Sequence, residues 1–230
     1  MKMRKWIFPF IVMGFVLTLS NSCKKDNNDD NNDDNSDDPV TTVTDIDGNV
    51  YSTVTIGTQV WMAENLKTTR YRNGDLITNV TGEQWDDNAS GAYCSYDNSA
   101  DNLKTYGLLY NWYAVNDSRI ICPEGWHIPT VDEWETLSNT GLALKEANTT
   151  HWMSPNETAQ NESGFSALPG GVCGFDGNFN ALTEMGYWWT TDEDDIENSW
   201  LINMSNNNPG ISGWINMNKW IGASVRCIQD

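Results

Sequence analysis

Two histidines are the only imidazoles in this 230-residue chain, and neither lies in a recognisable catalytic motif. His127 lies between Trp126 and Ile128, which indicates a structural turn, and His151 lies in a polar stretch. The chain has no His-Glu-x-x-His zinc motif, and residues 164–168 do not form a Gly-x-Ser-x-Gly elbow. Carboxylates are plentiful but mostly in loops, where no apolar pocket would raise a pKa for acid catalysis. The sequence therefore predicts a protein that is not an enzyme.

An acidic run near the carboxyl end is the candidate metal site. Its carboxylates belong to Asp192, Asp194, Asp195 and Glu197. Because Ca²⁺ prefers several oxygen ligands, this loop could hold a calcium ion. The alternative is a solvated anionic loop, and the chain lacks the Glu-Pro-Asn and Trp-Asn-Asp signatures of calcium-dependent lectins. We therefore expect no cofactor, with Ca²⁺ as the one candidate.

Tryptophan is the most distinctive binding residue in the composition, because 12 are present and 11 follow the amino-terminal segment. Most are expected in the core. Trp152, Trp214 and Trp220 instead lie among Asn, Ser, Gly and Thr residues. An exposed indole offers a flat apolar surface with a polar N–H, so these three predict a platform for a sugar ring or a protein partner. The alternative is that they pack under long loops.

The helix predicted over residues 131–139 has the clearest local signals. Thr130 is a good N-cap and Glu133 stands three residues later, so the pair predicts a capping box. Acidic residues occupy the first turns, where the helix dipole favours negative charge. Apolar residues recur at every third position and would face the core.

The remaining elements predict one α+β domain with two short helices and a twisted antiparallel sheet, joined by long irregular loops. Asp47-Gly48 and Gly57-Thr58 are the turn signals of a three-stranded meander over residues 43–62. The other helix is expected over residues 102–115. Further strands are expected at residues 165–167, 187–191, 199–204, 211–217 and 223–228.

The amino-terminal residues 1–22 are typical of a lipoprotein signal peptide, with a basic start and a short apolar stretch. Small residues then precede Cys23, although Ser20 stands where leucine is usual. Residues 23–40 are predicted to be a lipidated, acidic, disordered tether, because Asp and Asn cannot bury apolar surface. Such a tether resembles the surface-export signal of Bacteroidetes-type lipoproteins. We expect an outer-membrane lipoprotein exposed at the cell surface, with residues 41–230 as the folded domain.

The formal net charge of −19 restricts the partners. Nucleic acid binding requires a basic face against the phosphates, so no nucleic acid partner is expected. The same charge argues against electrostatic attachment to anionic lipids, which leaves the lipid anchor as the only expected contact with a membrane.

Four cysteines follow Cys23, namely Cys94, Cys122, Cys173 and Cys227. An even number in an exported domain predicts disulfides, with three possible pairings. The alternative is free, buried cysteine.

Several motifs, in order along the chain, resemble those of one family. The run Cys-Pro-x-Gly-Trp-His-Ile-Pro-Thr-x-x-Glu-Trp begins at Cys122, and Ser-Val-Arg-Cys ends at Cys227. Residues 56–66, 106–115 and 164–171 supply the others. Together these motifs resemble the Fibrobacter succinogenes major paralogous domain over nearly all of residues 43–230. The resemblance implies a C-type-lectin-like fold, similar to that of the sulfatase-modifying enzymes.

The resemblance also implies a disulfide pairing and a function. It places Cys122 and Cys227 in family motifs, so these two are expected to pair, which leaves Cys94 with Cys173. Sulfatase-modifying enzymes have closely spaced reactive cysteines near the carboxyl end, whereas Cys227 stands alone. We therefore expect a surface-anchored, non-catalytic binding module for a glycan or an extracellular protein. The alternatives are an envelope enzyme related to the sulfatase-modifying group and a structural surface protein without a small ligand.

Overall fold

The computed structural model describes residues 41–81, 85, 89–156 and 159–230. The predicted signal peptide of residues 1–22 and the tether of residues 23–40, with Cys23, lie outside the described residues. Within the described part of the chain, no helix is both long and apolar enough to cross a membrane.

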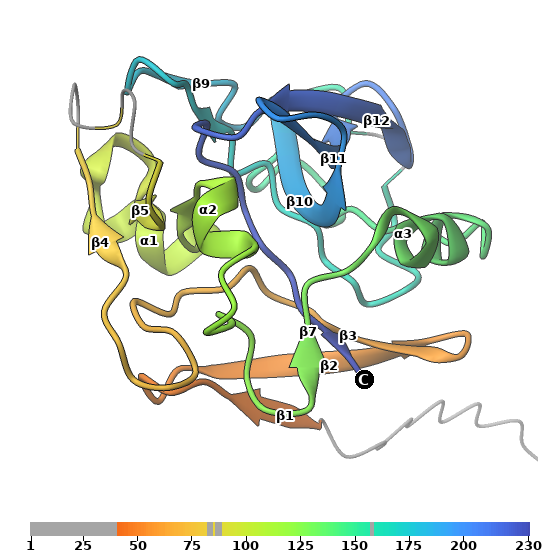
Figure 1. Cartoon of the computed structure of the whole chain (residues 1–230). Helices are drawn as coiled ribbons and strands as arrows, with labels where there is room; N and C mark the ends of the chain where they lie inside the picture. The colour runs from red at the N-terminus through yellow and green to blue at the C-terminus, as the bar shows by residue number, and fades with distance from the viewer. Residues whose placement is uncertain (1–40, 82–84, 86–88, 157–158) are drawn as a thin grey trace, which may run out of the picture. The chain divides into compact units, whose positions relative to one another are not determined.

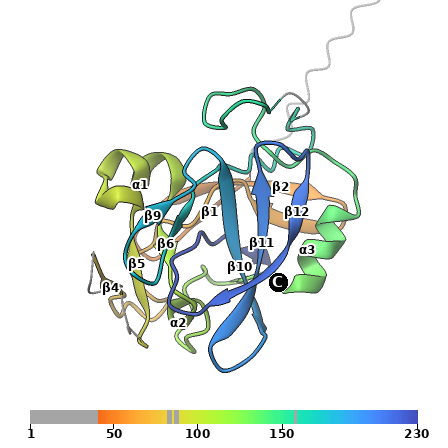
Figure 2. The same ribbon diagram turned by 90° about the horizontal axis from the view of Figure 1, so that it is seen from above.

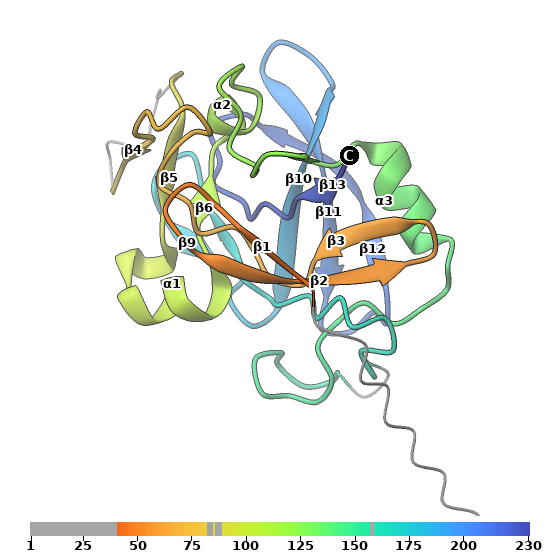
Figure 3. The ribbon, with the colours of Figure 1, turned by 90° about the horizontal axis from the view of Figure 1, so that it is seen from below.

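A five-stranded antiparallel sheet joins the start of the domain to its end (Figures 1 and 3). Its strand order is β1 (Thr42–Thr44), β2 (Val50–Ile56), β3 (Gln59–Met62), β13 (Ile228–Gln229) and β7 (Trp126–His127). The first three strands confirm the predicted meander. The last strand lies between β3 and β7, so segments that are distant in sequence share one sheet.

A second antiparallel sheet contains β10 (Met185–Glu193), β11 (Asn198–Ser205) and β12 (Ile211–Asn218) in that order. Its two faces pack against different apolar clusters. Trp188 and Ile202 belong to the cluster that contains Trp134 and Leu137 of helix α3. Leu201, on the opposite face, belongs to a larger cluster near the disulfide. The sheet therefore lies between two cores, and α3 lies alongside it (Figure 2).

The described residues contain three α-helices, α1 (Ala100–Tyr106), α2 (Trp112–Val115) and α3 (Val131–Ser138). The prediction of α3 is confirmed, capping box included. The prediction of one helix over residues 102–115 is wrong. Gly107 ends α1 with φ +80°, because its backbone passes against Asn65 and Leu66. Two short helices therefore replace the single predicted one.

Short strand pairs complete the architecture and correct two predicted strands. One small sheet contains β4 (Thr78–Asn79), β5 (Ala92–Cys94) and β6 (Leu109–Tyr110), and another contains β8 (Val172–Cys173) and β9 (Phe179–Asn180). Residues 165–167 form only a single bridge, between Ala167 and Lys145. Residues 223–228 form isolated bridges before joining the first sheet at Ile228. Among the named strands, only β4 and β5 pair in parallel, in agreement with the predicted α+β class and its antiparallel sheet.

Cys122 and Cys227 form a disulfide, as predicted, across a separation of 105 residues. The predicted pairing of Cys94 with Cys173 is not formed, and both are free, buried thiols. They lie in the same small cluster. A hydrogen bond with the Cys173 thiol, together with burial, raises the pKa of Cys94. The cysteine count correctly predicted that Cys94 and Cys173 lie close together, but it cannot determine whether they are oxidised.

Candidate functional site

A groove of about 370 Å³ lies where the end of β10 and the start of α3 meet the β11–β12 ladder. We call it the acidic–aromatic groove. It is lined by Val131, Asp132, Glu135, Asp192, Glu193, Trp200 and Trp214. None of the described residues that line it is basic, and it combines two indoles with four carboxylates.

The strand register places the two indoles on one face of the sheet. Trp214 lies directly opposite Ile202 in the β11–β12 ladder. Trp200 is two residues from Ile202, and side chains two apart on a strand share a face. Trp200 and Trp214 are thus diagonal neighbours, and both are partly exposed. Both side chains line the groove, and Trp214 also packs against the cluster that contains Ile202.

The wall opposite the indoles is fixed by the helix cap. Thr130 and Glu133 form a reciprocal capping box. Asp192 at the end of β10 accepts a hydrogen bond from the Val131 backbone N–H at 2.6 Å. A carboxylate is favourable at a helix amino terminus, where backbone N–H groups are free. This contact fastens the helix to the sheet and sets the width of the groove.

The carboxylates of the groove differ in how far they are already satisfied. Glu193 forms an ion pair with Lys219, whose side chain is almost fully buried. Lys219 also donates to the backbone oxygens of Asp195 and Ile196. Asp132 and Glu135 are exposed on α3, and their carboxylates have no partner among the described residues. These two are therefore available to accept hydrogen bonds or to face a cation.

Of the three tryptophans predicted to be a platform, only Trp214 lines the groove. The exposed position expected for Trp152 is wrong, because its side chain is 1% exposed and its indole N–H donates to the Ala167 carbonyl at 2.9 Å. Trp220 is half-buried, and its indole nitrogen lies in the interior without a partner among the described residues. Its polar neighbours therefore did not predict exposure.

The predicted calcium ligands are not gathered into one site. Asp192 caps α3, and Asp194 accepts from the Asn216 amide at 2.8 Å. Asp195 accepts from the backbone of Glu197 and Asn198, which closes the turn. Within the described ranges, no three acidic, histidine or cysteine side chains are placed to share a metal ion. Calcium stays a prediction for this loop.

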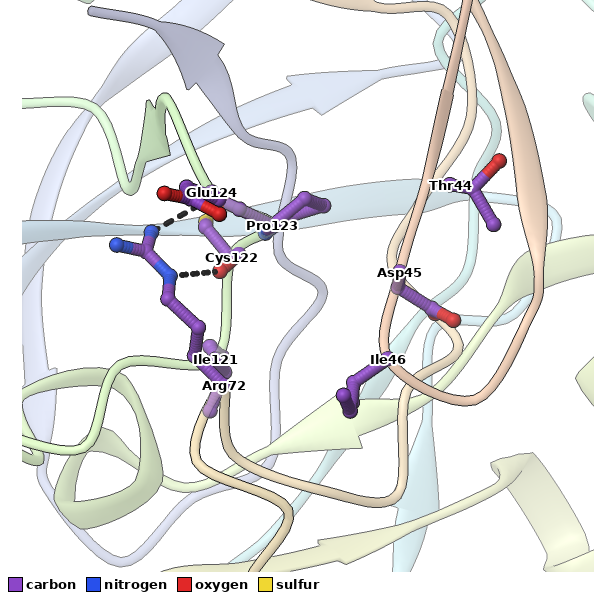
Figure 4. A pocket seen from close by; sticks show the side chains of 8 residues that line it. All are labelled: Thr44, Asp45, Ile46, Arg72, Ile121, Cys122, Pro123 and Glu124. Carbon is purple, nitrogen blue, oxygen red and sulfur yellow. Dashed lines mark hydrogen bonds between the residues drawn. The ribbon is translucent and has the colours of Figure 1, made fainter.

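A smaller hollow of about 230 Å³ lies beside the disulfide (Figure 4). Arg72 points into the turn that begins at Cys122 and donates to the carbonyls of Cys122, Pro123 and Trp126. Its guanidinium is therefore used to hold the turn. Thr44, Asp45, Ile46, Ile121 and Glu124 complete the lining.

A third hollow, of about 480 Å³, has charged groups in its lining, but these already have partners. Lys67 pairs with Glu64 at 2.9 Å, and Glu146 contacts His151 at 2.9 Å. Asn65, which lines this hollow, accepts hydrogen bonds through its Oδ1 from the indole N–H of Trp188 and the guanidinium of Arg226. We regard this region as structural support for the interior.

Sequence reasoning named Asp192 and Trp214 but missed the other five groove residues, which are Val131, Asp132, Glu135, Glu193 and Trp200. Trp200 lies in a strand that was predicted, but its face depends on the register with β12. Asp132 and Glu135 were interpreted only as favourable charges in the first turns of the helix. Their spacing of three residues does place them on one helical face, which is the signal that was available.

The comparisons with known proteins agree with the motifs. The family model of the Fibrobacter succinogenes major domain matches residues 54–229. Neither the curated proteins nor the solved structures that were compared include a match to the chain. The matched segment covers most of the described domain, including the β10–β12 sheet and the disulfide, but begins within β2. The chain belongs to the Fibrobacter succinogenes major domain family.

Proposed function

We propose that this chain is a surface-anchored, non-catalytic binding module, and that the acidic–aromatic groove holds its ligand, a glycan or an extracellular protein. The observation that carries the proposal is that Trp200 and Trp214 are diagonal neighbours on one sheet face. They lie beside the carboxylates of Asp132 and Glu135, which have no partner among the described residues. Aromatic faces contribute apolar contact, and carboxylates accept hydrogen bonds from hydroxyl or N–H groups.

Anchoring at the surface is part of the same proposal and rests on Cys23 and the acidic tether that follows it. Mass spectrometry of the membrane-extracted protein should find acyl chains on Cys23. Cys23→Ala should release the chain from the membrane fraction. An unmodified Cys23 on a freely released protein would remove this part.

A C-type-lectin-like fold is the finer architecture that we propose. It is supported by the loop-rich α+β arrangement and by the last strand, which returns to the first hairpin. The alternative of a sulfatase-modifying enzyme is disfavoured because Cys227 is held in a disulfide and Cys94 and Cys173 are buried. A structural surface protein would leave the open groove without a role.

Isothermal titration of the full-length chain in detergent tests the binding function, using panels of glycans and extracellular proteins with and without EDTA. Trp200→Ala and Trp214→Ala should each weaken binding by about tenfold, because each removes an aromatic contact. Phe175→Ala is the matched control, since Phe175 is 56% exposed but does not line the groove. Equal losses in all three variants would contradict the groove as the site.

A further inference from the structure

The outer edge of β12 is open. On the other side of the sheet, β10 has a neighbour. The backbone N–H of Trp189 donates to the Ser224 carbonyl, and the backbone N–H of Ser224 donates to the Tyr187 carbonyl. Beyond β12, the described residues provide no strand or bridge, and the backbone hydrogen bond from the Ile221 N–H to the Asn218 carbonyl lies at its very end. None of its eight residues is fully buried, whereas β11 has five that are. An edge of this kind presents unpaired N–H and C=O groups.

Few of the usual features that protect a strand edge are present. Natural edges are commonly protected by charged side chains, proline, bulges or very short strands. β12 reads Ile-Ser-Gly-Trp-Ile-Asn-Met-Asn, with no charge and no proline. Its one irregularity lies opposite Asn203 and Met204, near the start of the strand. Residues 213–218 thus form an unbroken edge long enough to pair with an extended segment.

The open edge and the groove meet at Trp214. A strand added beside β12 would place the side chain opposite Trp214 on the same face as that indole, because paired residues share a face. That side chain would lie at the mouth of the groove. A long cationic side chain there could cross the indole and reach the carboxylates of Asp132 and Glu135.

Charge decides what the segment must contain. Four carboxylates line the groove, of which Glu193 is paired with Lys219, while Asp132 and Glu135 have no cationic partner among the described residues. The whole chain has a net charge of −19. A second copy of the chain would bring the same negative charge to the edge, which opposes self-pairing. A segment of a different protein with an exposed Lys or Arg is complementary.

We propose that β12 receives an extended segment of a partner protein as a fourth strand, and that the acidic–aromatic groove holds a Lys or Arg side chain of that segment. This inference rests on the proposed function, because it assigns a partner class to the same groove. Backbone hydrogen bonds supply affinity in such strand addition, and the side-chain pocket supplies specificity.

Fluorescein-labelled heptapeptides of the form Thr-Val-Thr-Xaa-Thr-Val-Thr test the proposal, with Arg, citrulline or Glu as Xaa. Citrulline keeps the shape of arginine without its charge. Binding to the full-length chain in detergent is measured by fluorescence anisotropy. The Arg peptide should bind about tenfold more tightly than the citrulline peptide, and added salt should reduce this preference. Equal binding of Arg and Glu peptides would overturn the inference.

The groove charges are tested with a double variant and a matched control. Asp132→Asn with Glu135→Gln should reduce the preference for Arg over citrulline to about twofold, since two counter-charges are lost. Asp101→Asn should leave it unchanged, because Asp101 is an exposed carboxylate on α1. A preference that survives the double variant would overturn the inference.

The edge is tested by two adjacent prolines, Ile215→Pro and Asn216→Pro. Neighbouring strand residues point their N–H groups to opposite sides, so one of the two variants removes an outward backbone donor and the other an inward one. Asn216→Pro also removes the side-chain hydrogen bond to Asp194. The variant that keeps the wild-type melting temperature should bind the Arg peptide about tenfold more weakly. Amide exchange gives a second readout, because alternate amides of residues 213–218 should slow when the peptide binds.

The outcomes separate this inference from the proposed function. Glycan binding that depends on Trp200 and Trp214, without any peptide binding, would retain the proposed function and overturn the inference. Light scattering that shows a dimer, with β12 amides protected in the absence of peptide, would also overturn it. If neither glycans nor proteins nor peptides bind, both proposals fall.

Discussion

His127 Nδ1 lies 2.7 Å from Oδ1 of Asp230, the last residue of the chain. The other ring nitrogen lies 2.9 Å from Glu133 Oε1. Glu133 also closes the capping box of α3. One imidazole therefore links the final strand to the helix cap that forms a wall of the groove.

The position of His127 predicts a pH-dependent contribution to stability. Partial burial opposes protonation, but the carboxylates of Asp230 and Glu133 outweigh it and raise the pKa of His127. A raised folded pKa stabilises the fold below the unfolded value of about 6.5, and this contribution is lost as pH rises through the folded pKa. Because these side chains are partly exposed, we expect about 1 kcal/mol or less.

An NMR titration of the His127 ring protons checks this contribution. Asp230→Asn should lower the pKa of His127, since one carboxylate is removed, and should flatten the fall of unfolding free energy above about pH 6.5. An unchanged titration midpoint in the variant would show that the contact does not hold the proton.

Lys145 gives the opposite dependence at higher pH. Its side chain is buried, and its ammonium donates to the Ser205 carbonyl at 2.8 Å without a carboxylate partner among the described residues. Burial lowers the pKa of Lys145 to about 8. The unfolded chain therefore holds this proton more tightly, so the contribution of Lys145 to the unfolding free energy should rise from about pH 8 upward, by about 3 kcal/mol at most.

Urea denaturation between pH 7 and pH 9.5 measures the Lys145 effect as the difference between the wild type and Lys145→Met, because the raised pKa of Cys94 gives both proteins the same opposing fall in this range. Lys145→Met should remove the rise, because methionine fills similar space without a titrating group. The range stops below pH 10 because burial also raises the pKa of several tyrosines, Tyr51 among them. Above that pH these tyrosines would lose their protons in the unfolded state first, which would lower the unfolding free energy. A rise that persists in the methionine variant would exclude Lys145 as its source.

Local signals were sufficient where neighbours in sequence are neighbours in space. The capping box of Thr130 and Glu133 was predictable because both contacts lie within one helical turn. The meander over residues 43–62 was predictable because turn residues separate short β-prone runs. Each of these elements depends on residues within a few positions of one another, which a sequence shows directly.

The predictions failed where distant segments decide the structure. Trp152 has polar neighbours, yet its indole is bonded to a carbonyl 15 residues away and is buried. The helix expected over residues 102–115 is interrupted because Gly107 must pass the backbone of Leu66. The groove was missed for the same reason, since Trp200 and Trp214 share a face only through the pairing of β11 with β12.

The disulfide of Cys122 and Cys227 should make a large contribution to stability. It closes a separation of 105 residues, and a loop of that length reduces the entropy of the unfolded chain. Replacing both cysteines with serine should lower the unfolding free energy by about 4 kcal/mol. Urea denaturation measures the loss, and an unchanged midpoint would contradict the role of the bridge.

Cys94 and Cys173 should behave as two protected thiols. Both are buried, and their mutual contact with burial raises the pKa of Cys94, so little reactive thiolate is available. A thiol-specific reagent should modify neither Cys94 nor Cys173 in the native protein, and should modify both in denaturant. A count of zero in denaturant, without reductant, would instead show that the pair forms a second disulfide.

Gly171 and Gly48 form a matched pair that separates backbone strain from crowding. Both have positive φ, +66° at Gly171 and +85° at Gly48, so alanine is strained at each by about 1 kcal/mol. A Cβ at Gly171 would lie 2.5 Å from the Asn180 carbonyl oxygen, whereas nothing lies within 4 Å of one at Gly48. Gly171→Ala should therefore destabilise the fold by about 1–3 kcal/mol more than Gly48→Ala, as overpacking typically does. Equal losses in urea denaturation would show that the segment around β9 moves aside freely, and that the junction between Gly171 and Asn180 is not tightly packed.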